Sequence, residues 1–210
     1  MTLDEALNAC GLIAILRGVT PQEAVAVGQT LYDAGLRIVE VPLNSPDPFT
    51  SIAALAKAFG PRMVVGAGTV LSVQDVNMLK DHGGQISVSP DANPEVIART
   101  RAVGIEPLPG VFTPTEAFSA IRAGARHLKL FPAEAASPAT VKAWKAVLPK
   151  HVQIHAVGGV TSSNMAEWLA CGVTGFGIGS SLYKSGKSMG EISAAATELV
   201  AAYKRAKGQG

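Results

Sequence analysis

Short runs of apolar residues alternate along this chain with longer segments in which apolar residues recur every three or four positions. The short runs are typical of strands that are buried on both faces, and the longer period is typical of helices with one apolar face. We predict eight strands, over residues 12–17, 37–43, 63–67, 85–88, 105–108, 127–131, 152–157 and 173–178.

The predicted helices occupy the segments between these strands. Each begins near a Pro, Ser, Asp, Thr or Asn, which are common at the cap or in the first turn, and several end at a Gly. They cover residues 21–34, 48–59, 73–82, 94–103, 114–123, 138–147 and 164–170, with a last helix near 190–207 and a short one near 2–10 before the first strand.

Eight strand–helix units within 210 residues predict an α/β fold, a single (β/α)8 TIM barrel that uses residues 1–210 as one domain. A doubly wound open sheet is the alternative, because alternation alone does not distinguish a closed sheet from an open one. The open sheet is disfavoured because no Gly-rich dinucleotide fingerprint follows the first strand, where the chain reads Arg17-Gly18-Val19-Thr20-Pro21.

The composition excludes several classes of protein. Hydrophobic residues make up 48% of the chain and charged residues only 16%, which excludes a disordered chain. Eighteen Lys and Arg against sixteen Asp and Glu give a net charge of +2 without a basic run, so nucleic acid is not an expected partner. The first residues lack the basic and apolar regions of an export signal, and no apolar stretch is long enough to span a bilayer. We expect a soluble, cytoplasmic protein.

Two ionisable residues lie in the middle of predicted strands. Barrel strands are covered by helices outside and filled by side chains inside, and side chains alternate between the two faces. In the strand 37–43, Val39 and Val41 suit the helix layer, so Glu40 points into the barrel. By the same alternation, the strand 127–131 turns Lys129 inward.

Three further residues bear on the role of Lys129 and Glu40. The alternation that turns Lys129 inward also places His127 and Phe131 inside the barrel, and Arg17 stands at the carboxyl end of the first strand, where barrel active sites lie. One interpretation is a buried Lys129–Glu40 salt bridge that only stabilises the core. The other is catalytic: burial and a nearby cation would lower the pKa of the Lys129 amine, and the neutral amine could attack a ketone to form a Schiff base. Glu40 could then move protons.

Glycines near the carboxyl end of the chain predict a phosphate site. The seventh strand ends in Val157-Gly158-Gly159, and the eighth runs into Gly179-Ser180-Ser181. Loops after strands seven and eight commonly bind phosphate in this fold, because glycine lets backbone N–H groups approach the oxygens. Tight turns in a crowded barrel are the alternative explanation.

The remaining reactive side chains favour structural roles. His127 and His155 can face the interior, but neither has a carboxylate or a second His at metal-ligand spacing, so we predict packed or hydrogen-bonded core residues and no metal site. Cys10 and Cys171 form no spaced framework for disulfides or zinc, and we expect Cys171 to be a buried thiol.

Several segments in the right order carry a resemblance to a known family. They are Ile15-Leu16-Arg17-Gly18, Val39-Glu40-Val41, Gly66-Ala67-Gly68-Thr69-Val70, Leu128-Lys129-Leu130-Phe131-Pro132-Ala133-Glu134 and Gly179-Ser180-Ser181-Leu182-Tyr183. With them the chain resembles, over nearly its whole length, the class I 2-keto-3-deoxy-6-phosphogluconate and -phosphogalactonate aldolases.

This resemblance implies a role for each matching residue. Lys129 would form the Schiff base, and Glu40 would be the general acid and base. The resemblance further implies that Thr69 binds the pyruvyl carboxylate and that Pro90 and Phe131 shape the pyruvate pocket. The phosphate-binding residues would be Gly158, Gly159, Gly179, Ser180 and Ser181. It also implies a homotrimer, a phosphorylated keto-deoxy sugar acid as substrate, and no metal or other cofactor.

One segment bears on the substrate. The gluconate-type enzymes carry an Arg four residues after the Glu of the second strand. This chain has Asn44 at that position, in Glu40-Val41-Pro42-Leu43-Asn44-Ser45. The galactonate-type enzymes resemble this chain in that segment and in Ile15-Leu16-Arg17-Gly18, so Arg17 would supply the cation that faces the carboxylate. The resemblance favours 2-dehydro-3-deoxy-6-phosphogalactonate over the gluconate epimer, without excluding the latter.

Three functions stay open at this point. The first is a Schiff-base aldolase that yields pyruvate and glyceraldehyde 3-phosphate. The second is a phosphate-binding barrel isomerase or synthase in which Lys129 acts as a cation, and the third is a barrel that senses a sugar phosphate without catalysis.

Overall fold

The computed structural model describes residues 1–208; residues 209 and 210, the last two of the expected domain, lie outside the described part. Nine strands form one sheet. They are β1 (Leu12–Ile15), β2 (Ile38–Pro42), β3 (Val64–Gly68), β4 (Ile86–Val88), β5 (Glu106–Leu108), β6 (Gly110–Val111), β7 (His127–Leu130), β8 (Gln153–Val157) and β9 (Gly175–Ile178). All strand pairs in the sheet are parallel.

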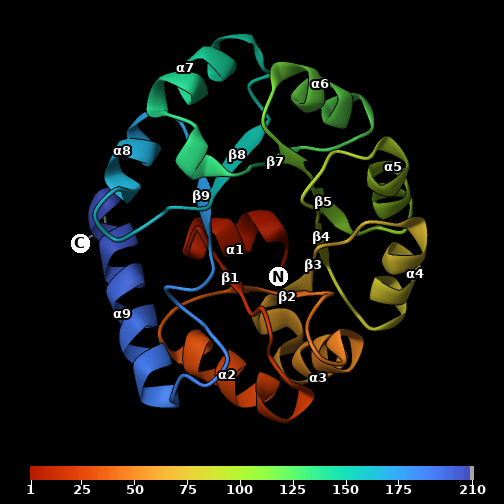
Figure 1. The fold of residues 1–210 in the computed structure, drawn as a ribbon, viewed down its shortest axis with the longest axis vertical. Coiled ribbons are helices and arrows are strands. Elements are labelled where there is room, and N and C mark those ends of the chain that lie inside the picture. The colour runs from red at the N-terminus through yellow and green to blue at the C-terminus, as the bar shows by residue number, and fades with distance from the viewer. Residues whose placement is uncertain (209–210) are drawn as a thin grey trace.

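Helices follow the strands and form a ring around them (Figure 1). They are α2 (Pro21–Asp33), α3 (Pro48–Phe59), α4 (Val73–Asp81), α5 (Pro94–Ala102), α6 (Pro114–Arg122), α7 (Pro138–Val147), α8 (Met165–Ala170) and α9 (Met189–Ala206). A further helix, α1 (Leu3–Ala9), precedes β1, and short 3-10 turns lie at Gly60–Arg62 and Ala133–Ala135. Six helices start at a Ser or Thr whose side chain takes part in a capping box, as the start signals in the sequence predict.

The sheet closes through a strand that is split in two. The strand order is β5-β4-β3-β2-β1-β9-β8-β7-β6, so the two ends of the sheet, β5 and β6, are neighbours along the chain with only Pro109 between them. β5 pairs with β4, and β6 pairs with β7. The predicted barrel is confirmed, and the alternative of an open sheet is wrong. The prediction of one strand at 105–108 missed β6; Pro107 and Pro109 have no N–H to give to a ladder, which weakens the pattern there.

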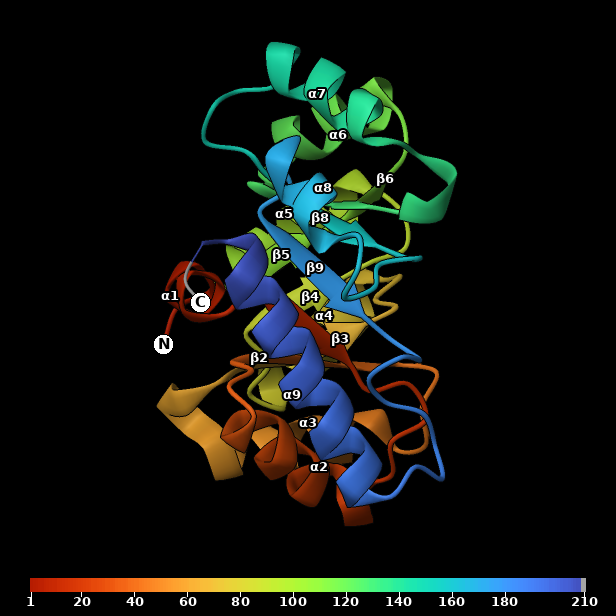
Figure 2. The same cartoon turned by 90° about the vertical axis from the view of Figure 1, so that its left-hand side faces the viewer.

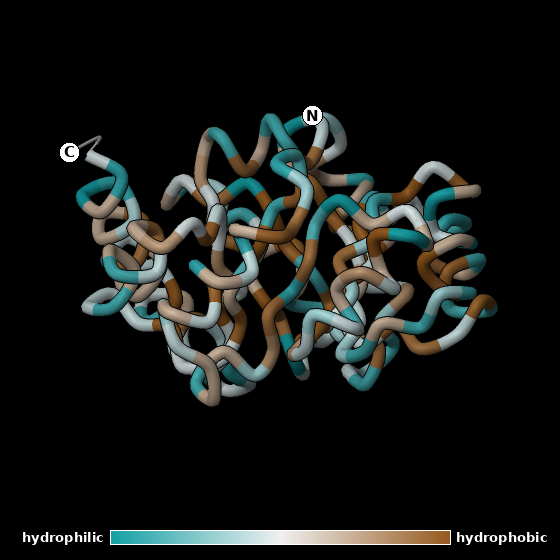
Figure 3. The backbone as a smooth tube through the Cα atoms, turned by 90° about the horizontal axis from the view of Figure 1, so that it is seen from above, coloured by the Kyte–Doolittle hydropathy of each residue, from teal (hydrophilic) through white to brown (hydrophobic). Residues whose placement is uncertain are grey.

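The strands separate two apolar layers. Val39, Val41, Leu128 and Leu130 belong to the large cluster between strands and helices, as their alternation predicts. A smaller cluster fills the barrel from within, and Figure 3 shows hydrophobic stretches running through the middle of the molecule. Its members are Leu3, Ala6, Leu7, Ile13, Ile38, Val64, Ile86, Val88 and Leu108.

Helix α1 closes the amino end of the barrel. Its buried residues Leu3, Ala6 and Leu7 belong to the inner cluster, and the helix stands in the centre of the ring in Figure 1 and at one end of the strands in Figure 2. The opposite, carboxyl end therefore offers the open mouth of the barrel. No helix within residues 1–208 combines the length and the apolar character that a membrane crossing requires.

Candidate active site

A cleft of about 460 Å³ opens at the carboxyl end of the strands. All eleven residues that the sequence singles out line it: Arg17, Glu40, Thr69, Pro90, Lys129, Phe131, Gly158, Gly159, Gly179, Ser180 and Ser181. They come from seven strands or the loops that follow them, and closure of the barrel brings them together.

Lys129 and Glu40 lie at the floor of this cleft. Lys129 is on β7 and Glu40 on β2; they are 9% and 3% exposed, so neither group is turned out to bulk solvent. Beneath them is a space of about 10 Å³ among mainly apolar side chains, roughly the size of one water molecule. The two groups therefore sit where the barrel changes from an open cleft to an apolar core.

Burial displaces the pKa of both groups toward their neutral forms. The pKa of Lys129 is lowered, chiefly by desolvation and further by the charge of Arg17, while Glu40 acts in the opposite direction. Desolvation raises the pKa of Glu40 to about 7, against smaller opposing effects from Lys129 and Arg17. A neutral amine is a nucleophile, and an acid with a pKa near neutrality can both give and take a proton.

The two groups do not form an ion pair. In residues 1–208 no Lys129 nitrogen lies within 4.0 Å of a Glu40 oxygen, so the interpretation as a core-stabilising salt bridge is wrong. Oε2 of Glu40 is buried without a hydrogen-bond partner in that part of the chain. It lies against Gly68, where an added Cβ would collide with the carboxylate. Gly68 thus makes the room that Glu40 occupies.

Arg17 lies in the loop after β1, because that strand ends at Ile15 and not at Arg17 as predicted. Its Nη1 donates to Oδ1 of Asn44 at 2.6 Å. One residue further along each loop, the N–H of Gly18 donates to Oγ of Ser45 at 3.0 Å. These two bonds join the loops after β1 and β2 and hold the guanidinium at the rim of the cleft.

Thr69, in the loop after β3, and Phe131, in the loop after β7, also line the cleft. Thr69 has a φ of +59°, a left-handed conformation that is costly for a β-branched residue and is found mainly at functional sites. The ring centroid of Phe131 lies 4.4 Å from Nζ of Lys129. The aromatic face therefore shields the amine from one side.

Unused backbone donors gather at the far end of the cleft. Within residues 1–208, the N–H groups of Gly158, Gly159 and Val160 donate to no protein acceptor, and neither do those of Gly179, Ser180 and Ser181. Both sets line the same cleft. Free amides that converge on one space favour an anion, and a phosphate has the oxygens to accept from several of them.

The glycine residues themselves have a second explanation. Gly158 has a φ of +103°, and an added Cβ would collide with the carboxylate of Glu134; a Cβ at Gly159 would lie 2.8 Å from Cβ of Glu134. Glycine is needed here because the turn Ala133–Ala135 packs against the loop. The free amides, and not the glycines as such, are therefore the evidence for an anion site.

Sequence reasoning missed part of the cleft. Glu134, Val157, Val160 and Thr161 also line it, together with Ile15. Glu134 was visible only as part of a family segment, since no alternation or spacing marks a residue in a 3-10 turn. The others are apolar or hydroxyl side chains at strand ends, which have no distinctive pattern.

The two buried histidines contact each other, a pairing that their spacing in the sequence does not reveal. Nδ1 of His127 and Nε2 of His155 are 3.1 Å apart, and Nε2 of His127 is 3.6 Å from Oδ1 of Asp4. The cause is register: His127 and His155 lie on adjacent strands, and α1 brings Asp4 to the amino end of the barrel. The prediction of hydrogen-bonded core histidines is confirmed.

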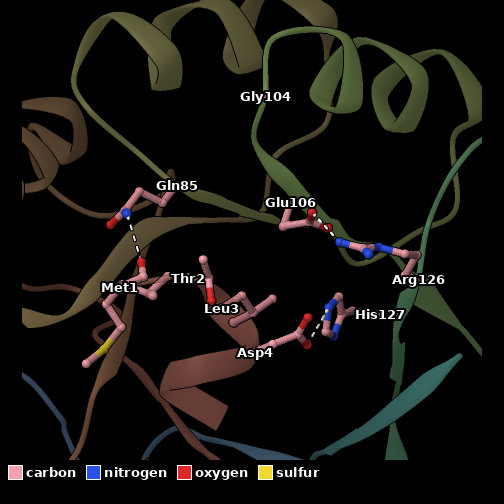
Figure 4. A pocket seen from close by; sticks show the side chains of 10 residues that line it. Met1, Thr2, Leu3, Asp4, Gln85, Gly104, Glu106, Arg126 and His127 are labelled. Carbon is pink, nitrogen blue, oxygen red and sulfur yellow. Dashed lines mark hydrogen bonds and ion pairs between the residues drawn. The ribbon is translucent and has the colours of Figure 1, made fainter. Parts of the chain in front are cut away.

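The carboxylate of Asp4 lies at a second pocket, of about 370 Å³, at the amino end of the barrel (Figure 4). Its charged groups are already paired: Glu106 binds Arg126 at 2.9 Å and also binds Arg101. Desolvation lowers the pKa of His127, and burial lowers that of His155 to about 3, so both rings are neutral at pH 7. Asp4 of α1 contacts His127 at this pocket, while Oε2 of Glu106 and Nδ1 of His155 are buried without a hydrogen-bond partner within residues 1–208.

No cluster of three or more His, Cys, Asp or Glu side chains suited to a metal ion occurs within residues 1–208. Cys10 and Cys171 are both buried and free, and the thiol of Cys171 donates to the carbonyl of Trp168 at 3.0 Å.

The comparisons with known proteins agree with this geometry. A model of the KDPG and KHG aldolase family matches residues 3–195. A 2-dehydro-3-deoxy-6-phosphogalactonate aldolase of Escherichia coli (strain K12) is 47% identical over 195 residues, 93% of this chain and 95% of that protein.

Two solved structures are similar over most of their length. The structure described as native KDPGal has a TM-score of 0.92 at 46% identity and covers 94% of this chain and 96% of its own. A KDPG aldolase from Legionella pneumophila, with pyruvate captured at low pH as a covalent carbinolamine intermediate, has a TM-score of 0.83 at 26% identity and the same two coverages of 94% and 96%. With sequence, fold and family model in agreement over nearly its whole length, the chain belongs to the KDPG and KHG aldolase family.

Proposed function

We propose that this protein is a class I aldolase that cleaves 2-dehydro-3-deoxy-6-phosphogalactonate to pyruvate and D-glyceraldehyde 3-phosphate. The observation that carries the proposal is the floor of the cleft. There a sheltered amine with a lowered pKa and a carboxyl group with a pKa of about 7 stand below a cluster of free backbone amides.

In the proposed reaction, neutral Lys129 attacks the C2 carbonyl of the keto acid and gives a carbinolamine. Loss of water then leaves the protonated Schiff base. The C4 hydroxyl loses its proton, the C3–C4 bond breaks, and its electrons flow into the iminium to give an enamine and the aldehyde. Protonation of the enamine at C3 and hydrolysis release pyruvate and regenerate the amine. Glu40 moves the protons in these steps, for which a pKa near the working pH is suited.

The rest of the cleft would hold the two ends of the substrate. Arg17 and Thr69 would bind the carboxylate, with Pro90 and Phe131 around the pyruvyl part. The free amides beside Gly158, Gly159, Gly179, Ser180 and Ser181 would bind the phosphate. Binding energy at the phosphate, far from the reacting carbon, would align the C3–C4 bond over Lys129.

The galactonate-type substrate is favoured by two features. The curated relative at 47% identity carries that name, and the chain has Asn44 where the gluconate-type enzymes carry an Arg. Comparing kcat/KM for the two C4 epimers tests this choice. A higher value for the galactonate epimer supports it, and equal values or a preference for the gluconate epimer would overturn it.

The aldolase proposal itself is tested by incubating the protein with pyruvate and borohydride. Mass spectrometry should find one covalent adduct, located at Lys129, and none in the Lys129→Ala variant. The variant should also lose aldol cleavage while its binding of phosphate esters stays measurable. Phosphate-dependent stabilisation without any adduct would instead favour an isomerase, a synthase or a sensor.

We further propose that the enzyme is a homotrimer that works in the cytoplasm, in galactonate degradation of the Entner–Doudoroff type. The trimer is implied by the family resemblance and is supported by large apolar side chains that stay exposed in the loops after β3 and β6, Leu71 at 51% and Phe112 at 41%. The two free thiols are in keeping with a reducing compartment. Sedimentation of the protein in solution tests the trimer.

A further inference from the structure

The loop after β9 forms one wall of the proposed phosphate site and makes a tight turn there. The N–H groups of Leu182 and Tyr183 both donate to the carbonyl of Gly179, at 2.9 and 3.0 Å. These bonds use the amides of residues 182 and 183, whereas those of Gly179, Ser180 and Ser181 stay free within the described chain and line the cleft.

A lysine further along the loop folds back onto the other side of this turn. Nζ of Lys187 donates to the carbonyl of Ser181 at 2.9 Å and makes longer contacts of 3.4 Å with the carbonyls of Ser180 and Leu182. Its side chain is half-buried. Three successive carbonyl groups therefore converge on one ammonium group.

This arrangement orients one amide that faces the cleft, that of Ser181, and holds the turn whose other two amides bond Gly179. In a trans peptide the N–H and the C=O point in opposite directions. An ammonium that holds the carbonyl of Ser180 thus turns the N–H of Ser181, in the same peptide unit, away from itself. A cation behind the carbonyls also polarises the peptide groups and lowers the cost of bringing a dianion to their N–H side.

We propose that Lys187 is a positioning residue for the substrate's phosphate group. It acts through the backbone of residues 180–182 and does not itself touch the phosphate. This inference rests on the aldolase function proposed above and adds to it the residue that keeps the phosphate-binding turn in its binding conformation.

Lys184 provides a matched control in the same loop. It carries the same charge three residues earlier, is exposed, and donates no side-chain hydrogen bond to residues 1–208. Lys184→Met therefore removes the same charge without removing a carbonyl contact. A pure effect of charge would be similar in both variants, and an effect of positioning would be confined to Lys187.

The experiment compares Lys187→Met, Lys187→Gln, Lys187→Arg and Lys184→Met by three readouts: KM and kcat for the phosphorylated substrate, competitive inhibition by inorganic phosphate, and borohydride trapping of pyruvate, which has no phosphate. We expect Lys187→Met to raise KM and the inhibition constant of phosphate about tenfold, the effect of losing a charge-assisted hydrogen bond. Its kcat and its pyruvate trapping should stay close to those of the unaltered protein.

The other variants complete the test. Lys187→Gln keeps one donor, so its KM and its inhibition constant for phosphate should lie between those of the unaltered protein and those of Lys187→Met. Lys187→Arg should recover most of the phosphate affinity, and Lys184→Met should change that affinity less than twofold. The inference is overturned if Lys184→Met matches Lys187→Met, or if pyruvate trapping falls together with phosphate affinity. Absence of a pyruvate adduct in the unaltered protein would reject the aldolase function, a result that is distinct from either of these.

Discussion

At the scale of single residues, burial acts in opposite directions on the two groups at the floor of the cleft. Desolvation disfavours charge, so it lowers the pKa of the Lys129 amine and raises that of the Glu40 carboxyl. Both changes favour the forms that the proposed chemistry uses. The cost is a loss of folding stability, because Glu40 is buried with one carboxylate oxygen that has no hydrogen-bond partner within residues 1–208.

That cost depends on pH in a defined way. The folded-state pKa of Glu40, about 7, exceeds the ordinary value of 4.5. Below 4.5 the carboxyl group is neutral in both states; as pH rises toward 7 it ionises in the unfolded state first, so stability is lost. Glu40→Gln should therefore be more stable than the unaltered protein at pH 8, by on the order of 1–3 kcal/mol, and the gain should shrink toward pH 4.

Urea unfolding at pH 4 and pH 8 measures this difference. A gain that is the same at both pH values, or a loss of stability at pH 8, would contradict a buried, unpaired carboxyl with a raised pKa.

The same pKa predicts a pH profile for proton transfer. Exchange of the pyruvate methyl protons with deuterated water requires a base once the Schiff base has formed, and ionised Glu40 would serve. The exchange rate should fall as pH drops below about 7 and level off above it. NMR of the methyl signal measures the rate; a profile unchanged in Glu40→Gln would show that another group removes the proton.

At the scale of elements, the loops after β1 and β2 work as a unit. The bond from Arg17 to Asn44 and the bond from Gly18 to Ser45 join them, although 27 residues separate the partners of each bond. Arg17 is exposed, and its long side chain would otherwise sample many rotamers. Asn44 therefore limits the positions from which Arg17 can meet a carboxylate.

Substitutions in this pair separate binding from chemistry. Arg17→Ala should chiefly weaken keto-acid binding, by tenfold or more in KM, because a charged hydrogen-bond donor is lost. Asn44→Ala should raise KM by a smaller factor, about threefold, since the guanidinium remains but is less restrained. Steady-state kinetics with both variants measure these factors. Kinetics of Arg17→Ala that match those of the unaltered protein would show the carboxylate assignment to be wrong.

At the scale of the whole molecule, the strand order explains why one site draws on residues from 17 to 181. Parallel strands place all their carboxyl ends at one end of the barrel, and α1 closes the other. We propose that the whole chain is one domain, because each strand pairs with neighbours on both sides except at the split between β5 and β6.

A single domain should unfold in one step. Calorimetry should find one transition with equal calorimetric and van't Hoff enthalpies, provided that the protein is measured at a concentration where its oligomeric state does not change. Two resolved transitions would show that the barrel unfolds in separate parts.

Many of the helices and strands could be predicted from the local pattern of apolar and polar residues. The helices Pro48–Phe59 and Pro138–Val147 have the predicted bounds, and most other elements end within a few residues of theirs. The inward position of Lys129 and Glu40 followed from the alternation of side chains along a strand. The later parts of the site, the roles of Thr69 and Pro90 above all, rested on the family resemblance and stay proposals.

By itself, the sequence determined the order of the strands and helices and the faces of each strand, because both depend on residues that are neighbours in the chain. Only the tertiary structure decided how distant segments meet. It closed the barrel at Pro109, set His127 against His155, kept the Lys129 and Glu40 charges more than 4.0 Å apart, and folded Lys187 back onto its turn. Such contacts depend on the strand register and side-chain packing of the completed barrel, which the local periodicity of apolar residues does not encode.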